Sequence, residues 1–562
     1  MKSIKTAILF TAAMLVPVLA GINGSVCQAQ MDNVVDIENS YRPEVKDASK
    51  INVLPDIEPT TTRHYNVQYS LSPLPTSTYS FQPAWAAGSD AVEAGAPRGF
   101  ATLAGGTRGN VLARGAYGLK FSDDDLLNFD LSLRGHNGYV GSDFYDPYRE
   151  RARFYTTRGS IGYEHKFDHQ SSLLIDADVE SQVFNYSYDK QHNYLGDFTA
   201  AVTPYQFSRF SLGGAVGFSL FNQEHLQPHY SADEKAGETH LFTRANAGYD
   251  LSDESSVKLD VAANTFSYNL RSFDNYTSFD VNPHFDYNNG KLRLRAGLHL
   301  NLASGFGAKT RLAPDVRLGY LAGKTTDLFV ALEGGEVFND YRRFAQMSPY
   351  WMHAYPFIPF EVVVPQQLPQ QFDRLRASAG VNWHFAEGWF TKLYGGIDLS
   401  RNRAELYDMG NFLAAADGTH FYAGARFHYD GLQQRFHADA DTRFHSWKTD
   451  GLPGDNASHI LEWRPNTELD AKADYDVVPR VNVGIDFLLR TYSDKDTQVI
   501  KMPTAANVGL SATYQVPVRS LRPGQHLSLY VRGDNLFNCH YNEYLGYRAQ
   551  GRSVLVGAAV TF

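Results

Sequence analysis

Apolar and polar residues alternate one by one along most of the chain, from about Gly99 to Phe562. In residues 291–302 the even positions hold leucines and one alanine, whereas the odd positions hold three cations, a glycine, a histidine and an asparagine. The same alternation occurs in residues 127–134, 481–490 and 553–562. A period of two is typical of β-strands with one apolar and one polar face, so the pattern predicts a chain built mainly from strands.

The lengths of these stretches and of their connections separate two kinds of all-β fold. Alternation alone is equally typical of a soluble sandwich, whose strands average about 5 to 6 residues. The stretches here run to about 11 to 15 residues, enough for the ~9 to 11 that a tilted membrane strand needs. Tight connections such as Asn289-Gly290, a pair that favours positive φ at both central positions of a hairpin turn, alternate with long ones such as Asn339 to Asp373 and Asn402 to Gly418. Short periplasmic turns opposite long external loops are typical of outer-membrane barrels, which we therefore predict.

The strand count follows from the same alternation of short and long connections. We find about 21 strand-like stretches, and the alternation breaks between Ser187 and Glu238. Because single-chain bacterial barrels have an even number of strands, we expect one hidden strand there and about 22 in all, with about 20 as the alternative. A barrel in lipid leaves no edge unpaired, so we expect the last strand to pair with a first strand near Phe100 to Gly106. The predicted fold class is all-β: a transmembrane antiparallel β-barrel with an extended N-terminal segment.

The first residues have the layout of a secretory signal peptide. Two lysines precede an uncharged apolar run from Ala7 to Gly21, and small and polar residues follow it. We predict that residues 1–29 are a cleaved signal peptide; the alternative is a lipoprotein signal with Cys27 as the lipidated residue. The run is too short for a spanning helix, which needs about 20 apolar residues, and no other run in the sequence is long enough.

Two regions follow the predicted signal peptide. Residues 30–98 are rich in proline and lack sustained alternation, so we expect an extended segment rather than a packed domain. This segment either folds back into the lumen as a reduced plug or stays in the periplasm as a tether for another protein. Residues 99–562 are expected to form the barrel.

Charge and composition exclude several classes of function. The formal net charge is −10, and removal of residues 1–29 takes away two lysines and no acid, so no binding to nucleic acid is expected. The chain has 2 Cys, of which only Cys539 follows residue 29, so neither an internal disulfide nor a pair of cysteine metal ligands is expected. The 19 His are scattered, and no metal-binding or nucleophile motif is present. We therefore expect no metal, no cofactor and no enzymatic activity.

The C-terminal residues resemble the closing hairpin of TonB-dependent receptors. The resemblance is carried by Val531-Arg532-Gly533-Asp534-Asn535-Leu536-Phe537, Tyr541, Tyr544-Leu545-Gly546-Tyr547, Gly551-Arg552 and the terminal Phe562. It implies the outer membrane of a Gram-negative bacterium, a transport function, and a terminal Phe that the outer-membrane assembly machinery reads. Such receptors normally carry a plug domain of well over a hundred residues inside the barrel. Residues 30–98 are too few for that domain and contain no plug motif.

A short segment near the predicted mature N-terminus resembles a TonB box, the stretch that pairs with TonB as an added strand. It consists of Asn33, Val34, Val35, Asp36 and Ile37. The resemblance implies TonB as a partner, although a short apolar run at such a place also arises by chance.

The longest external loop, Asn339 to Asp373, is the candidate for contact with a ligand or partner. Its candidate residues are Tyr341, Arg342, Arg343, Phe344, Tyr350, Trp351, Tyr355 and Phe357. Rigid aromatic side chains in a loop stack on sugars or anchor a protein partner. The alternative is that they pack on one another or join the aromatic girdle at the lipid boundary. The arginines are candidates for contact with lipopolysaccharide or with an anionic solute.

Two functions remain open at this point. The first is a receptor of the TonB-dependent type that takes up a nutrient, metal chelate or oligosaccharide. The second is a non-transporting barrel that acts as a scaffold or accessory subunit for partner proteins, which the short N-terminal region favours. In both cases the expected surroundings are outer-membrane lipid and lipopolysaccharide.

Overall fold

The structure is a computed structural model of the chain. It describes residues 98–141, 149–167, 171–186, 189–225, 235–269, 273–349, 367–407, 412–431, 435–450, 463–492, 502–518, 525–544 and 547–562. The predicted signal peptide and the TonB-box-like residues 33–37 lie outside the described residues, so both remain predictions.

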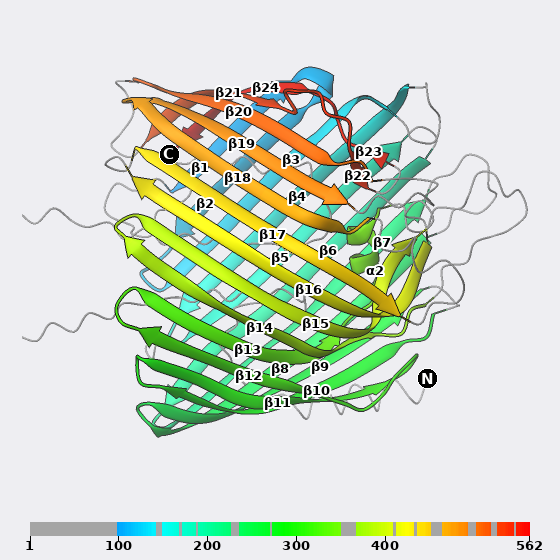
Figure 1. Ribbon diagram of the computed structural model, residues 1–562, viewed down its shortest axis with the longest axis vertical. Helices are drawn as coiled ribbons and strands as arrows, with labels where there is room; N and C mark the ends of the chain where they lie inside the picture. Colours follow the sequence, from blue (N-terminus) through cyan, green and yellow to red (C-terminus); the bar gives the residue numbers. More distant parts are fainter. Residues whose placement is uncertain are drawn as a thin grey trace, which may run out of the picture.

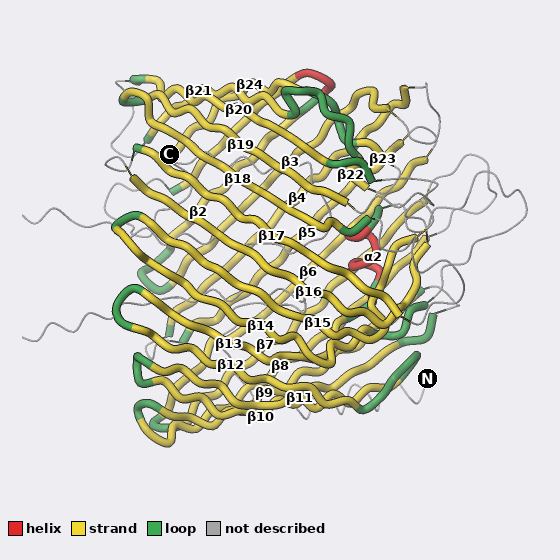
Figure 2. The backbone as a smooth tube through the Cα atoms, in the orientation of Figure 1, coloured by secondary structure: helices red, strands yellow, loops and turns green. Residues whose placement is uncertain are grey.

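A single sheet of 22 antiparallel strands dominates the molecule and closes into a barrel (Figures 1 and 2), which confirms the predicted fold class and strand number. The strands of the barrel are β1 (Gly99–Gly106), β2 (Val111–Lys120), β3 (Asp125–Gly141), β4 (Arg149–Lys166), β5 (Ser172–Tyr186), β6 (Asp189–Phe207), β7 (Phe210–His225), β8 (Lys235–Ser252), β9 (Ser255–Tyr268), β10 (Tyr276–Asn288), β11 (Leu292–Ser304), β12 (Arg311–Ala322), β13 (Thr326–Val337), β14 (Gln371–Ala386), β15 (Trp389–Tyr407), β16 (Phe412–Gly431), β17 (Phe436–Asp450), β18 (Pro465–Val478), β19 (Val481–Tyr492), β20 (Ala505–Val516), β21 (His526–Asp534) and β24 (Ser553–Thr561).

The connections add a few short elements. These are a 3-10 turn, η1 (Thr107–Gly109), an α-helix, α2 (Tyr341–Met347), and a separate hairpin of β22 (Asn542–Tyr544) and β23 (Tyr547–Arg548). Among the described residues no helix is both long enough and apolar enough to cross a bilayer.

The barrel is closed by pairing of the first strand with the last. β1 pairs with β2 on one side and with β24 on the other, in a register that places Phe100 opposite Thr561 and Gly106 opposite Leu555. Across this seam the hydroxyl groups of Thr102 and Tyr530 are hydrogen-bonded at 2.9 Å. The predicted closure is therefore confirmed, and the sheet has no free edge.

The barrel is apolar outside and polar inside. In β11, Leu298 and Leu302 lie on the outer face and are 46% and 41% exposed, whereas Asn301 lies on the opposite face and is 1% exposed. A water-soluble protein buries its leucines and exposes its asparagines. The reversed arrangement suits a barrel whose outer face contacts lipid tails and whose inner face contacts water or polar groups.

Tight turns join the strands at one end of the barrel (Figure 2), and most of the longer intervals between consecutive strands fall at the other end. The connection between β5 and β6 is an exception, because it lies at the external end but spans only residues 187–188. This short external connection breaks the alternation of short and long connections, so one strand could not be recognised from the sequence. β6 and β7 fill the interval between Ser187 and Glu238, so the expected hidden strand is present.

Two details differ from the sequence-based expectations. At the β10–β11 turn Gly290 has a φ of 79°, but Asn289 does not have a positive φ. The Asn289 side chain instead accepts the Leu292 N–H at 2.7 Å, which gives a three-residue hairpin loop rather than a two-residue one. The predicted long loop Asn402 to Gly418 is mostly strand, because β15 and β16 stay paired up to Tyr407 and Phe412. A β-bulge after Ser400 shifts the register there and interrupts the alternation.

Aromatic side chains gather on the outer face at the tight-turn end. Ring centroids are 5.0 Å apart between Trp383 and Phe385, 5.3 Å between Phe385 and Trp389, and 4.1 Å between Trp389 and Tyr429. Rows of this kind mark the lipid–water boundary of outer-membrane barrels. Because the turns of outer-membrane barrels are short on the periplasmic side, we assign the tight-turn end to that side.

Candidate functional site

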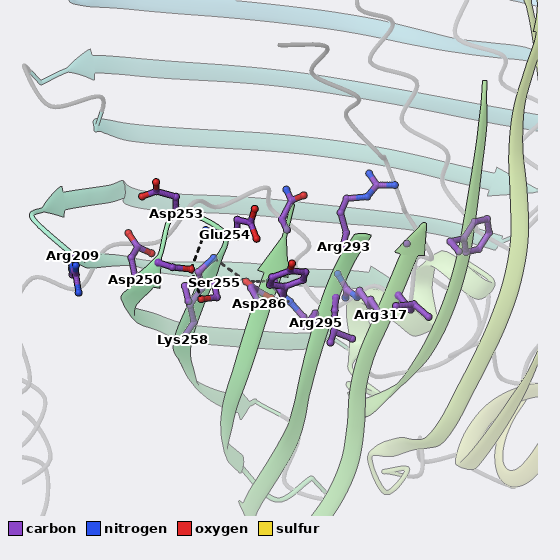
Figure 3. A pocket seen from close by; sticks show the side chains of 18 of the residues that line it. Arg209, Asp250, Asp253, Glu254, Ser255, Lys258, Asp286, Arg293, Arg295 and Arg317 are labelled. Atoms are coloured by element: carbon purple, nitrogen blue, oxygen red, sulfur yellow. Dashed lines mark hydrogen bonds and ion pairs between the residues drawn. The ribbon is translucent and has the colours of Figure 1, made fainter. Parts of the chain in front are cut away.

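The inner wall of the barrel carries dense charge near its periplasmic end. A recess of about 770 Å³ is lined by residues of β6, of β8 to β13 and of the β6–β7 and β8–β9 turns (Figure 3). Its charged residues include Lys258 on β9, Asp286 on β10, Arg293 and Arg295 on β11, and Arg317 on β12. These positions belong to the polar phase of each strand, so alternation alone directs them inward.

Ion pairs hold these side chains against the wall. Asp286 accepts hydrogen bonds from Lys258 Nζ at 2.9 Å and from Arg295 Nε at 3.0 Å. Arg293 and Arg317 donate to buried acids of β13, Asp327 and Glu333, at 2.5 Å each. The side chains of the three arginines remain 30% to 50% exposed.

An arrangement of paired and partly exposed charges suits two chemical roles. It stabilises a polar or charged solute in the lumen, or it provides a polar surface on which another segment of protein can rest. Within the described residues no group of three or more His, Cys, Asp or Glu side chains is placed to hold a metal ion.

The described residues that directly follow β13 lie inside the mouth of the barrel and form α2. Asp340 caps the helix, and its carboxylate accepts the Arg343 N–H at 2.7 Å. A carboxylate at this place satisfies a free N–H group and lies at the favourable end of the helix dipole. Tyr341, Phe344 and Met347 recur every third residue and form the buried face.

The wall of the barrel holds α2 from two sides. On one side Glu238 of β8 accepts the Tyr341 N–H at 2.7 Å, and Asp197 of β6 accepts a hydrogen bond from Arg342 at 2.6 Å. On the other side Arg343 donates to Gln371 of β14 at 2.7 Å. Asn339, just before the helix, donates to the Asn402 carbonyl of β15 at 2.9 Å.

An apolar core surrounds α2 and crosses the outer mouth of the barrel. Tyr341 and Phe344 are completely buried. Their cluster includes Phe221, Ala236, Phe273, Met347, Leu368, Ala404, Leu406, Trp463 and Met502, with Leu195 and Tyr492 packed against it. Leu195 lies on β6 and Tyr492 on β19, which are nearly opposite in the ring of strands. The polar lumen is therefore narrowed by an apolar cluster at the end where α2 lies. Figure 1 shows the position of α2 at that end of the barrel.

Burial and charge shape the titration of the groups around α2. Burial raises the pKa of the Asp340 carboxyl. Burial alone would lower the pKa of Arg342, but its hydrogen bond and attraction to Asp197 outweigh this and raise it. The buried guanidinium of Arg343 has a lowered pKa, since burial outweighs the attraction of Asp340.

A second group of buried charges adjoins the apolar core. Glu405 accepts hydrogen bonds from Arg403 at 2.5 Å and from Arg464 at 2.7 Å. The guanidinium carbons of both arginines lie over the ring of Trp447, 5.2 and 4.6 Å from its centroid. His420 stacks on the same indole with a centroid distance of 3.6 Å. This network stiffens the wall beside α2.

The structure brings some of the predicted site residues together and leaves others outside its description. Tyr341, Arg342, Arg343 and Phe344 lie on α2 inside the mouth, rather than on an outward-facing loop. The candidates Tyr350, Trp351, Tyr355 and Phe357 lie outside the described residues. Contact of any of these residues with a ligand remains a prediction.

Sequence reasoning missed the wall residues that hold α2. Asp197 lies on β6, inside the interval where the strand pattern was broken. Arg403 and Glu405 lie in the interval taken for a long loop. Correct strand boundaries would have placed Asp197 on the inner face, but no local pattern indicates its partner on α2, 145 residues away.

Comparison with known proteins shows what the barrel is similar to. No protein-family model matches the sequence. No curated protein sequence matches it either. Solved structures do match in fold: the FrpB iron transporter from Neisseria meningitidis (F5-1 variant) has a TM-score of 0.62 and 9% sequence identity, over 83% of this chain and 82% of that one.

Two further solved structures have a similar fold. The copper transporter OprC has a TM-score of 0.60 and 13% identity, over 83% of this chain and 80% of that one. The siderophore receptor PirA from Pseudomonas aeruginosa has a TM-score of 0.58 and 12% identity, over 83% of this chain and 81% of that one. At these identities the likeness concerns the fold alone: the 22-stranded barrel of this chain matches the barrels of TonB-dependent receptors.

Proposed function

We propose that this protein resides in the outer membrane of a Gram-negative bacterium and takes up a polar solute, such as a nutrient, metal chelate or oligosaccharide, as a receptor of the TonB-dependent type. The observation that carries the proposal is the charged inner wall of a closed membrane barrel. Partly exposed arginines along the lumen can form charge-assisted hydrogen bonds with a polar or anionic solute that passes through it. The proposal includes no chemical reaction and no bound cofactor.

The apolar crossing at α2 supports gated rather than open passage. A 22-stranded barrel is wide enough for a water-filled lumen unless something fills it. Because α2 and its core narrow the external end, we expect the purified protein to give little steady conductance in planar bilayers. A large, constant conductance would contradict gated uptake and support a simple pore.

Dependence on TonB is tested by binding. The full chain, extracted in detergent, is mixed with the periplasmic domain of TonB, and the same measurement is made after deletion of residues 31–40. We expect binding that is lost on deletion, because the predicted TonB box lies within this stretch. As a matched control, deletion of the ten residues 61–70 should leave binding unchanged.

The alternative function predicts a different result. If the barrel is a scaffold, the chain should copurify with a stoichiometric outer-membrane partner and should not bind the TonB domain. That outcome would refute energised uptake while leaving the outer-membrane location intact.

A further inference from the structure

The lipid-facing surface of β17 and β18 is hollowed by small side chains. Ala438 lies directly opposite Ala473, and Ala440 lies opposite Ala471, in the pairing of these two strands. All four alanines belong to the apolar, outward phase of their strands. They form a floor on which no side chain projects beyond a methyl group.

Large side chains border this floor on both sides. Phe427 and Tyr429 of β16 are paired with Ala440 and Ala438, and Phe487 and Ile485 of β19 are paired with Ala471 and Ala473. Three strand spacings separate the two ridges, or roughly 14 Å. Together they enclose a groove of about 320 Å³ whose walls are almost entirely apolar side chains.

A cation lies at the periplasmic end of the groove. Phe436 and Tyr475, which are opposite each other, close the alanine floor there. The guanidinium carbon of Arg435 lies 5.4 Å from the centroid of the Tyr475 ring. Its Nε and Nη2 donate to the carbonyl groups of Asp476 and Val477 at 2.6 to 3.0 Å, so the side chain is fixed in place.

No carboxylate of the described residues neutralises the charge of Arg435. Within the described residues no carboxylate forms an ion pair with it, and its Nη1 has no hydrogen-bond partner. Arg480, in the exposed turn between β18 and β19, likewise forms no ion pair in the described part of the chain. A fixed and unneutralised arginine at the lipid boundary suits a phosphate group, which accepts charge-assisted hydrogen bonds.

The size of the groove and its position on the lipid-facing surface indicate which kind of ligand it can bind. Its volume of about 320 Å³ is at the lower end of the range for small-molecule sites, about 300 to 1,000 Å³. The backbones of β17 and β18 are fully paired, so no strand can be added there. We propose that the groove binds one glycerophospholipid of the periplasmic leaflet, with an acyl chain over the alanines and the phosphate at Arg435.

Native mass spectrometry of the full chain in detergent tests this site, with palmitoyl-oleoyl-phosphatidylglycerol as the probe. We expect one tightly held lipid per chain. The double variant Ala440→Leu/Ala471→Leu fills the floor, and Arg435→Gln removes the cation. Each should lower retention of the lipid about tenfold. This is the effect expected from losing one charge-assisted hydrogen bond or an apolar contact of similar free energy.

Matched controls separate the site from general lipid contact. Ala296→Leu enlarges an exposed, lipid-facing alanine on β11, and Lys324→Gln removes a cation from the β12–β13 turn. Both should retain lipid like the parent chain.

Heat-dependent migration in gels confirms that each variant is a folded barrel, and Ala471→Leu alone replaces the double variant if that one does not fold. Equal retention in parent, groove-filled and Arg435→Gln chains would overturn the proposal, as would equal losses in the controls. The inference does not rest on the proposed transport function.

Discussion

Truncation of Phe344 to alanine tests whether α2 is a closing element held by its apolar face. The Phe344 side chain is 0% exposed and lies at the centre of the core that crosses the mouth. Removing a buried phenylalanine costs about 3 to 5 kcal/mol. The strand pairing of the barrel does not involve α2, so we expect this cost to fall on docking of the helix and not on the barrel itself.

The expected increase in opening of α2 follows from this free-energy cost. At 1.4 kcal/mol per tenfold change, the open fraction of α2 should rise by a factor of about 10² to 4 × 10³. Ser348, which follows the helix and is 1% exposed, provides the reporter as Ser348→Cys in a Cys539→Ala background. The rate at which a water-soluble thiol reagent modifies this introduced cysteine measures how often the segment opens.

A lipid-facing phenylalanine supplies the control. Phe279 on β10 is 49% exposed and does not touch α2, so Phe279→Ala should leave the labelling rate of the introduced cysteine unchanged. Both variants should show the heat-dependent gel migration of an intact barrel. Should Phe344→Ala label no faster than the parent, α2 is held by something other than its apolar core, and the reasoning fails.

Three further predictions address the lipid face, a turn and the polar anchor of α2. Leu298→Arg places a cation among lipid tails in the middle of β11 and should destabilise the barrel by about 2 to 4 kcal/mol in urea unfolding from vesicles, whereas His299→Arg on the inner face should not. Gly290→Ala forces a side chain into the left-handed region at a φ of 79° and should cost about 1 to 2 kcal/mol in the same assay. Asp197→Asn removes the charge opposite Arg342, whose side chain is 33% exposed, and should weaken docking of α2 by about 1 kcal/mol, seen as a roughly fivefold faster labelling in the Ser348→Cys background. A neutral result for Leu298→Arg would contradict a lipid-facing outer wall, and an unchanged labelling rate for Asp197→Asn would show that this ion pair does not hold the helix.

The wall of the barrel could be predicted from the sequence because its cause is local. A strand between lipid and a polar lumen needs apolar and polar side chains at alternating positions. The polarity of Leu298 and His299 therefore indicates which face of the strand each occupies, without any knowledge of the neighbouring strands. The closing of β24 onto β1 was also predictable, since an unpaired edge in lipid is too costly. The β-bulge after Ser400 was not, because one extra residue shifts the phase of everything that follows it.

The inward course of the β13–β14 connection could not be predicted for a different reason. Its aromatic residues and prolines suit an exposed loop as well as a buried one. What decides between them is contact with Asp197, Glu238 and Leu406, which come from distant parts of the chain. The capping Asp340 and the spacing of Tyr341 and Phe344 are a signal for a short helix, but not for where that helix lies.

The seam between the first and last strands has a consequence for how the protein is made. Phe100 cannot meet Thr561 until the whole chain has been synthesised, so the cylinder can close only after the last strand has been made. Until then both terminal strands expose unpaired backbone groups, which can pair with other chains. A product that stops short of β24 retains two open edges permanently, and a sheet with open edges cannot be accommodated in lipid.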